Sequence, residues 1–180
     1  FKGLTLNFEL DVTPDAEVEV VIDKNTGSNI KGRGAGSLLM EIDTNGKFNM
    51  WGDFITYEGE YNFKYRGIVN KRITVEQGGS IGWEGDPYRA QLNLAATYEL
   101  NANPDILLEN PTFNKKIPTK VSIKLEGDLM ELDPTFEIDF PNASGIAKSE
   151  LQYLLNDDDK RQLQALSLLS QGSFVNNVNI

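Results

Sequence analysis

Apolar and polar residues alternate through the first three quarters of the chain. In the segment 4–12, Leu6, Phe8 and Leu10 share one face and polar residues separate them. Alternation with a period of two is typical of β-strands that bury one face and expose the other. The pattern predicts about ten short strands, among them 4–12, 16–22, 37–43, 47–54, 59–65, 72–75, 90–100, 120–129 and 135–140.

Turn-forming residues lie between these segments. Asn45-Gly46 is a strong signal for a two-residue hairpin, because both residues accept the positive φ that such a turn requires. Gly78-Gly79 and Asp86-Pro87 are also typical of turns. The strands are therefore expected to form an antiparallel meander. We interpret the stretch 78–87 as a corner of the fold with Trp83 facing inwards; the alternative is a tryptophan that stacks on a ligand.

The last part of the chain loses the alternation and shows leucines at helical spacing. The pattern predicts two short amphipathic helices within 144–172, separated near Asn156, with Asp157 to Asp159 at the start of the second. Their inward leucines are expected to include Leu163, Leu166 and Leu169. The expected organisation is one domain: a sheet over 1–143, the helical pair over 144–172, and the start of a further segment over 173–180.

The apolar face of so many strands has to be covered. A sheet can close into a barrel, fold into a sandwich, or curl into an open trough that something apolar fills. Glycines inside strands mark bends and bulges, and they favour a strongly bent single sheet over two flat layers. These glycines are Gly34, Gly36, Gly52, Gly59 and Gly127.

Composition narrows the possible functions. The net charge of −10 argues against nucleic acid, which needs clustered Lys and Arg. The chain has no cysteine and no histidine, so it lacks thiol nucleophiles, thiolate metal sites and the usual general base. The pair Glu58 and Glu60 alternates onto the polar face with no pocket implied, and we expect no enzymatic activity. We also expect no metal and no cofactor, since 23–27 lacks the ligand run of a calcium loop.

Several runs together resemble a known family. They are GEYNFKYRG from Gly59, KRITVEQGGSIGWEGDPYRAQLNLAATYEL from Lys71, VSIKLEGDLMELDPTFEIDFP from Val121, and SLLSQG from Ser167. Their order is similar to the C-terminal domain family of TamB, which is related to AsmA-like envelope proteins of Gram-negative bacteria. The resemblance covers roughly Gly59 to Phe174. A sequence of this composition, without histidine or cysteine, is similar to the members of the family found in Bacteroides-type bacteria.

The resemblance implies a mostly-β, curled, U-shaped antiparallel sheet with an apolar inner groove. It implies a periplasmic module whose parent protein is anchored in the inner membrane. Such a module would give phospholipid acyl chains a path between the membranes and support outer-membrane protein assembly with a TamA-type barrel partner. The alternatives are a strand-templating chaperone for outer-membrane β-barrel clients, and a closed barrel that binds a small apolar ligand.

If the groove exists, its expected lining is the apolar stripe of the first five segments. These residues are Phe8, Leu10, Val20, Leu38, Met40, Phe48, Met50, Phe54, Tyr61 and Phe63.

Overall fold

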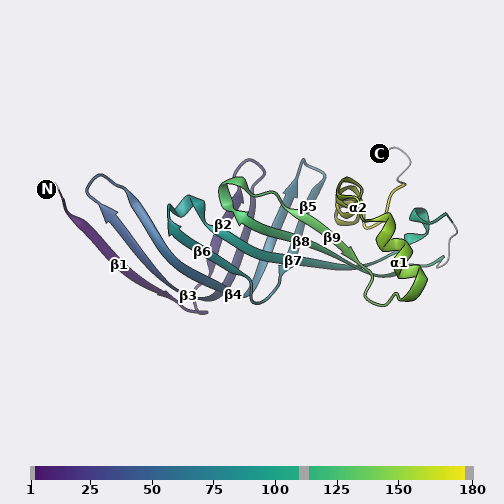
Figure 1. Cartoon of the computed structure of the whole chain (residues 1–180), viewed down its shortest axis with the longest axis horizontal. Coiled ribbons are helices and arrows are strands. Elements are labelled where there is room, and N and C mark those ends of the chain that lie inside the picture. The colour runs from purple at the N-terminus through teal and green to yellow at the C-terminus, as the bar shows by residue number, and fades with distance from the viewer. Residues whose placement is uncertain (1–2, 110–113, 177–180) are drawn as a thin grey trace.

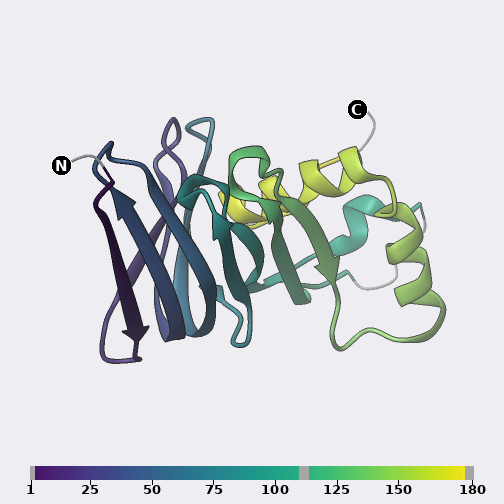
Figure 2. The ribbon, with the colours of Figure 1, turned by 60° about the vertical axis from the view of Figure 1, so that its left-hand side comes forward.

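The structure is a computed structural model that describes residues 3–109 and 114–176. These residues form a nine-stranded sheet, with two α-helices at the end of the sheet opposite β1 (Figures 1 and 2). The strands are β1 (Thr5–Val12), β2 (Val18–Asp23), β3 (Ser28–Asp43), β4 (Phe48–Tyr65), β5 (Val69–Val75), β6 (Ser80–Gly85), β7 (Gln91–Ala102), β8 (Ile117–Asp128) and β9 (Thr135–Asp139). The helices are α1 (Gly145–Leu154) and α2 (Asp158–Gln171), and the 3-10 turns are η1 (Pro87–Arg89), η2 (Pro104–Leu107) and η3 (Leu129–Glu131).

All strand pairs are antiparallel. The main path through the sheet is β1-β3-β4-β5-β7-β8-β9. β2 pairs with β3 beside β1, and β6 pairs with both β4 and β7. β5 and β6 therefore fill the place of one interrupted strand between β4 and β7.

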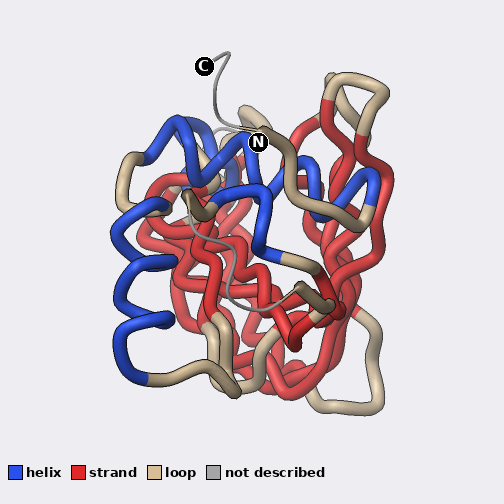
Figure 3. The backbone as a smooth tube through the Cα atoms, turned by 90° about the vertical axis from the view of Figure 1, so that its right-hand side faces the viewer, coloured by secondary structure: helices blue, strands red, loops and turns tan. Residues whose placement is uncertain are grey.

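The sheet curls but does not close. Among the described residues, β1 and β2 at one edge form no pairs with β9 at the other. The closed barrel considered from the sequence is therefore wrong, and so is a sandwich, because the described strands belong to one sheet. The prediction of a curled antiparallel sheet with two C-terminal helices is confirmed. The end-on view of Figure 3 shows the strands bending round, with the helices at the near end.

The long hairpin β3–β4 contains a β-bulge and a close approach of its two strands. The register shifts between Arg33 and Gly34, which is a β-bulge. At Gly34 an added Cβ would lie 2.0 Å from the carbonyl oxygen of Ile55, so only glycine fits this close approach of β3 to β4. A turn does form at Asn45-Gly46, with φ of +79° at Gly46. The two-residue form is wrong, because Asn45 does not have a positive φ and the N–H of Asp43 donates to the carbonyl of Lys47 at 3.1 Å across a longer loop.

The strand boundaries in this region differ from the prediction. The sequence predicts a strand that starts at 37 and two separate segments at 47–54 and 59–65. In the structure β3 already begins at Ser28, and β4 runs without a break from Phe48 to Tyr65. The glycines interrupt the apolar pattern without ending the strands, because a glycine-containing strand bends and stays paired.

The two helices begin and end near the predicted positions. Asp157 caps α2, since its side chain accepts a hydrogen bond from the backbone N–H of Lys160 at 3.0 Å. Helix α2 packs against β9 and β5, so it covers the inner face at that end of the sheet. Leu166 and Leu169 are buried as expected.

The prediction for Leu163 is wrong, since 37% of this residue is exposed. The buried stripe of α2 runs instead through Ala165 and Leu168, and it includes Gln164. The Gln164 amide donates to the carbonyl of Val175 at 2.8 Å and accepts from its N–H at 3.0 Å. A buried polar residue thus breaks the apolar pattern from which a helix face is inferred.

Part of the segment 173–180 packs on the helices, and residues 177–180 lie outside the described part. Phe174 is buried, and its ring centroid lies 5.9 Å from that of Phe140. The Ser167 hydroxyl donates to the carbonyl of Ser173 at 2.6 Å. The described residues of this segment therefore belong to the same core as α2.

Candidate functional site: the inner trough

The register of β1, β3 and β4 aligns apolar side chains in rows on the concave face. Phe8 lies opposite Met40, and Met40 lies opposite Met50. A second row runs through Leu6, Ile42 and Phe48 in the same way. Because successive strand residues point to opposite faces, both rows lie on one side of the sheet. That side is the inner face of the curl.

The inner face of β1 is exposed. The exposed fractions of Leu6, Phe8 and Leu10 are 49%, 47% and 44%. In contrast to the far end, where α2 covers the sheet, β1 packs mainly against its partner strand β3 among the described residues. We call this part the open end: β1 with the paired parts of β3 and β4, residues 36–43 and 48–54.

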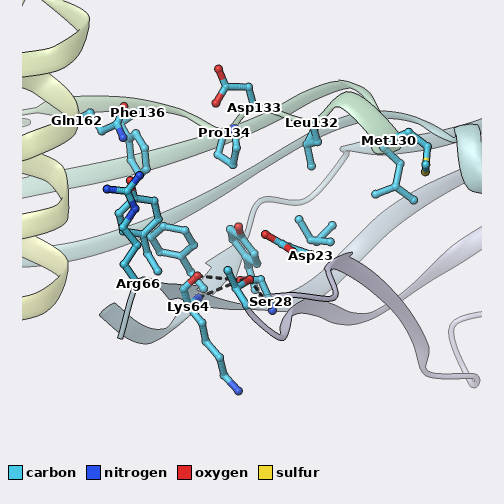
Figure 4. Close-up of a pocket in the computed structure, with 16 residues that line it drawn as sticks. Asp23, Ser28, Lys64, Arg66, Met130, Leu132, Asp133, Pro134, Phe136 and Gln162 are labelled. Atoms are coloured by element: carbon cyan, nitrogen blue, oxygen red, sulfur yellow. Dashed lines mark hydrogen bonds between the residues drawn. The ribbon is translucent and has the colours of Figure 1, made fainter. Parts of the chain in front are cut away.

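Two adjoining cavities continue the trough beyond the open end. The larger, about 840 Å³, lies between β2 on one side and the turns η1 and η3 on the other. Its walls include the apolar side chains of Val20, Met50 and Trp83. The smaller, about 490 Å³, lies between the ends of β2 to β4 and the chain from η3 into β9 (Figure 4). Both cavities share Ile22, Asp23, Leu129 and Met130, so they form one continuous depression.

The stretch 78–87 has the two predicted turns, but strand β6 (Ser80–Gly85), which the sequence did not predict, lies between them and pairs with β4 and β7. Its tryptophan forms part of the trough wall. Gly78 has φ of +93° in the turn before β6, and Ile81 is buried. The Trp83 indole N–H donates to the carbonyl of Pro87 at 3.2 Å, and the ring lines the larger cavity. The Asp86 side chain accepts from the N–H of Tyr88 at 2.9 Å and starts η1.

The ten residues predicted to line a groove fall into three groups along the trough. Two are exposed at the open end (Phe8 and Leu10), four are half-buried (Val20, Met40, Phe48 and Met50), and four are buried (Leu38, Phe54, Tyr61 and Phe63). Val20 and Met50 line the larger cavity, whereas Tyr61 and Phe63 line the smaller one. Contact of these residues with acyl chains stays a prediction.

Sequence reasoning missed the side of the depression formed after β8. Leu129, Met130 and Leu132 come from η3 and the loop behind it, where the strand alternation has stopped. Met130 is exposed although it is apolar. The sequence did contain a signal for this wall: three large apolar residues stand in an Asp-rich turn, although turns are usually polar.

Burial perturbs one titratable group at the smaller cavity. Removal from water raises the pKa of the Tyr61 hydroxyl well above its usual value near 10. The negative charge of Asp23 raises the pKa of Tyr61 further. Tyr61 is therefore a neutral phenol at physiological pH, and Asp23 lies near enough to act on it electrostatically.

The acidic residues are placed for structural roles. Glu58 is exposed, and its carboxylate lies 3.8 Å from the Arg33 side chain. Within residues 3–109 and 114–176, no group of three or more acidic side chains is arranged to hold a metal ion. The same residues contain no helix long and apolar enough to cross a membrane.

The fold and the trough define a class: a single curled antiparallel sheet with an apolar concave face and one end covered by helices. The family model of the TamB C-terminal domain matches residues 1–179, and the chain therefore belongs to this family. The match extends the resemblance from Gly59–Phe174 to almost the whole chain. A search of curated proteins found no match. Members of the family are non-enzymatic, envelope-associated proteins with a role in outer-membrane assembly.

Proposed function

We propose that the trough solvates the acyl chains of phospholipids and gives them a path along the sheet. The observation that carries this proposal is the inner face of β1 at the open end, where Leu6, Phe8 and Leu10 are exposed beside the half-buried Met40 and Met50. Apolar side chains normally leave water on folding, at roughly 25 cal/mol per Å² of apolar surface. A contiguous exposed apolar surface therefore marks a binding site for an apolar partner.

The dimensions of the depression support the same proposal. Its two cavities, about 840 and 490 Å³, fall in the range of small-molecule sites, which is roughly 300–1,000 Å³. The larger cavity continues from Met50, which also belongs to the aligned row of the open end. A long apolar chain can therefore extend from the open end into the depression while staying in contact with apolar walls.

The wider role is proposed from the family to which the chain belongs. The module is proposed to act in the periplasm, in a parent protein anchored in the inner membrane, and to support outer-membrane protein assembly with a TamA-type barrel. Membership in a family tied to outer-membrane assembly supports this setting.

The trough is tested with a pair of neighbouring variants. Met40 faces inwards in the aligned row, whereas Leu39 is exposed on the outer face and lies opposite Trp51. Met40→Glu places a charge where the acyl chain would lie, and Leu39→Glu places the same charge outside. Native mass spectrometry after incubation with phospholipid vesicles should show roughly tenfold less bound lipid for Met40→Glu, because burying a charge is costly. Leu39→Glu should bind as the unaltered chain does, and equal binding by all three proteins would contradict the proposal.

A second candidate is a chaperone that templates strands of outer-membrane clients. The observation in its favour is β1, which has a partner strand on one side only among the described residues. Such an edge offers backbone groups to an added strand. A proline in β1, such as Asn7→Pro, would then reduce binding of an unfolded barrel client and leave lipid uptake unchanged. The reverse pattern, with lipid uptake lost only in Met40→Glu, supports the conduit.

A further inference from the structure

The smaller cavity differs from the rest of the trough because it combines aromatic walls with charged groups. Four rings line it in a connected series. The centroid of Phe63 lies 5.6 Å from that of Tyr61, 6.1 Å from that of Tyr65 and 6.1 Å from that of Phe136. The faces of aromatic rings attract cations, and ring-lined pockets bind ammonium groups.

A carboxylate lies beside these rings. Asp23 is at the end of β2, and Figure 4 shows its side chain pointing toward the middle of the cavity. One of its oxygens accepts a hydrogen bond from the N–H of Asn25 at 2.9 Å, which fixes the orientation of the carboxylate. No Lys or Arg among the described residues lies within ion-pair distance of Asp23. Its negative charge is therefore available to a cation in the cavity.

A fixed positive charge lies at the tip of the β4–β5 hairpin. The Arg66 guanidinium carbon is 5.1 Å from the centroid of the Tyr65 ring, and the backbone of Arg66 has φ of +46°. Within the described part of the chain, no carboxylate is within 4.0 Å of this guanidinium. A guanidinium group is suited to bind a phosphate through paired hydrogen bonds.

We propose that the smaller cavity binds the headgroup of a zwitterionic phospholipid, with the ammonium at Asp23 and the phosphate at Arg66. The proposal rests on the proposed function, since the acyl chains would extend into the adjoining larger cavity. A purely anionic headgroup offers no cation to Asp23 or to the rings. It also meets a chain with a net charge of −10. The cavity therefore selects zwitterionic over anionic headgroups.

The selectivity is measured with vesicles of equal parts dioleoyl-phosphatidylethanolamine, dioleoyl-phosphatidylcholine and dioleoyl-phosphatidylglycerol. The protein is separated from the vesicles and its bound lipid is quantified. The unaltered chain should bind phosphatidylethanolamine about tenfold over phosphatidylglycerol, the effect expected of one hydrogen-bonded charge pair. Phosphatidylcholine has no N–H to donate, and it should also be preferred over phosphatidylglycerol, through the charge of Asp23 and the faces of the rings. A difference between the ethanolamine and choline lipids shows whether hydrogen bonds or ring contacts dominate at the ammonium.

Two variants and a matched control locate the effect. Asp23→Asn keeps an oxygen for the N–H of Asn25 and should abolish the preference. Arg66→Gln should lower uptake of all three lipids several-fold, because each carries a phosphate. Asp133→Asn is the control, since Asp133 also lines the cavity but points away from it in Figure 4. A preference that persists in Asp23→Asn, or that is lost in Asp133→Asn, overturns the assignment.

The outcomes separate this inference from the function on which it rests. Lipid uptake without any headgroup preference overturns the headgroup site and leaves the conduit intact. A chain that takes up no lipid overturns the conduit. The site is then tested by itself with glycerophosphoethanolamine, which has no acyl chains, by following the amide NMR signals around Asp23. Saturable shifts that Asp23→Asn removes support the site, and unchanged signals overturn it.

Discussion

Strands β1 and β8 carry the same alternating pattern but end in opposite environments. Leu6, Phe8 and Leu10 of β1 are nearly half exposed, whereas Val121, Ile123 and Leu125 of β8 are almost completely buried. The difference arises from the neighbours. β8 lies between β7 and β9, in the half of the sheet where α2 closes over β9 and β5, whereas β1 is an edge strand beside β3. Alternation therefore predicts which face of a strand points inwards. Whether the side chains on that face are buried depends on the elements that pack against it.

The covered half, which we call the packed end, comprises β5, β7, β8, β9 and the helices. Its core includes Phe140, Leu151 and Leu168, each fully or almost fully buried. The packed end can supply the stability of the fold, and this allows the open end to keep apolar surface in contact with solvent. Folding and ligand binding are thereby divided between two ends of one sheet.

The largest effect should separate two phenylalanines. Phe140 at the packed end is fully buried, so Phe140→Ala should lower the free energy of unfolding by ~3–5 kcal/mol. Phe8→Ala at the open end should lower it by less than about 1 kcal/mol, since the side chain is half exposed already. Urea unfolding followed by circular dichroism measures both values. Equal losses for the two variants would contradict the division of roles.

The next effect concerns the hairpin β3–β4, which joins the open end to the rest of the sheet. Gly34→Ala forces a methyl group to within 2.0 Å of the Ile55 carbonyl oxygen, and overpacking of this kind costs about 1–3 kcal/mol. The control is Gly59→Ala, where the nearest atom, the Lys31 carbonyl oxygen, lies 3.1 Å away. Urea unfolding should show a clear loss for Gly34→Ala and a smaller one for Gly59→Ala. The opposite order would contradict the close approach of β3 to β4 at Gly34.

Much of this fold can be predicted from the sequence, because its signals are local. The Asn45-Gly46 turn and the Asp157 helix cap follow from backbone preferences of a few residues. The length of β3 could not be predicted, since its early part contains Gly32, Gly34 and Gly36, and pairing with β4 holds that part in the sheet. The β-propensity of such a segment is too low to predict a strand, because the partner strand supplies the stabilisation that the glycines lack.

The candidate site was less predictable than the fold for a related reason. The rows through Phe8 and Phe48 follow from alternation, which gives the face of each side chain. The cavity walls at Met130 and Leu132 come from a loop that only the curl brings opposite β2. Asp23 of β2 lines the same cavity as aromatic rings of β4 and β9. This placement likewise depends on how far the sheet bends. No local pattern encodes that distance.

The smallest effect should appear at high pH at Tyr61, which is buried in β4 and forms part of the smaller cavity wall. Its pKa in the folded protein is raised by burial and by Asp23, so the folded state holds this proton at pH values where the unfolded chain has lost it. The stability from Tyr61 is therefore fully present below about pH 10 and declines above it, by at most about 1.4 kcal/mol per pH unit. Tyr61→Phe should flatten this decline in urea unfolding between pH 9 and 11, a window set around the tyrosine reference value of about 10. Tyr153→Phe on the exposed face of α1 is the matched control and should leave the decline unchanged. The same slope in all three proteins would show that Tyr61 is open to solvent, and that the covered part of the sheet begins beyond it.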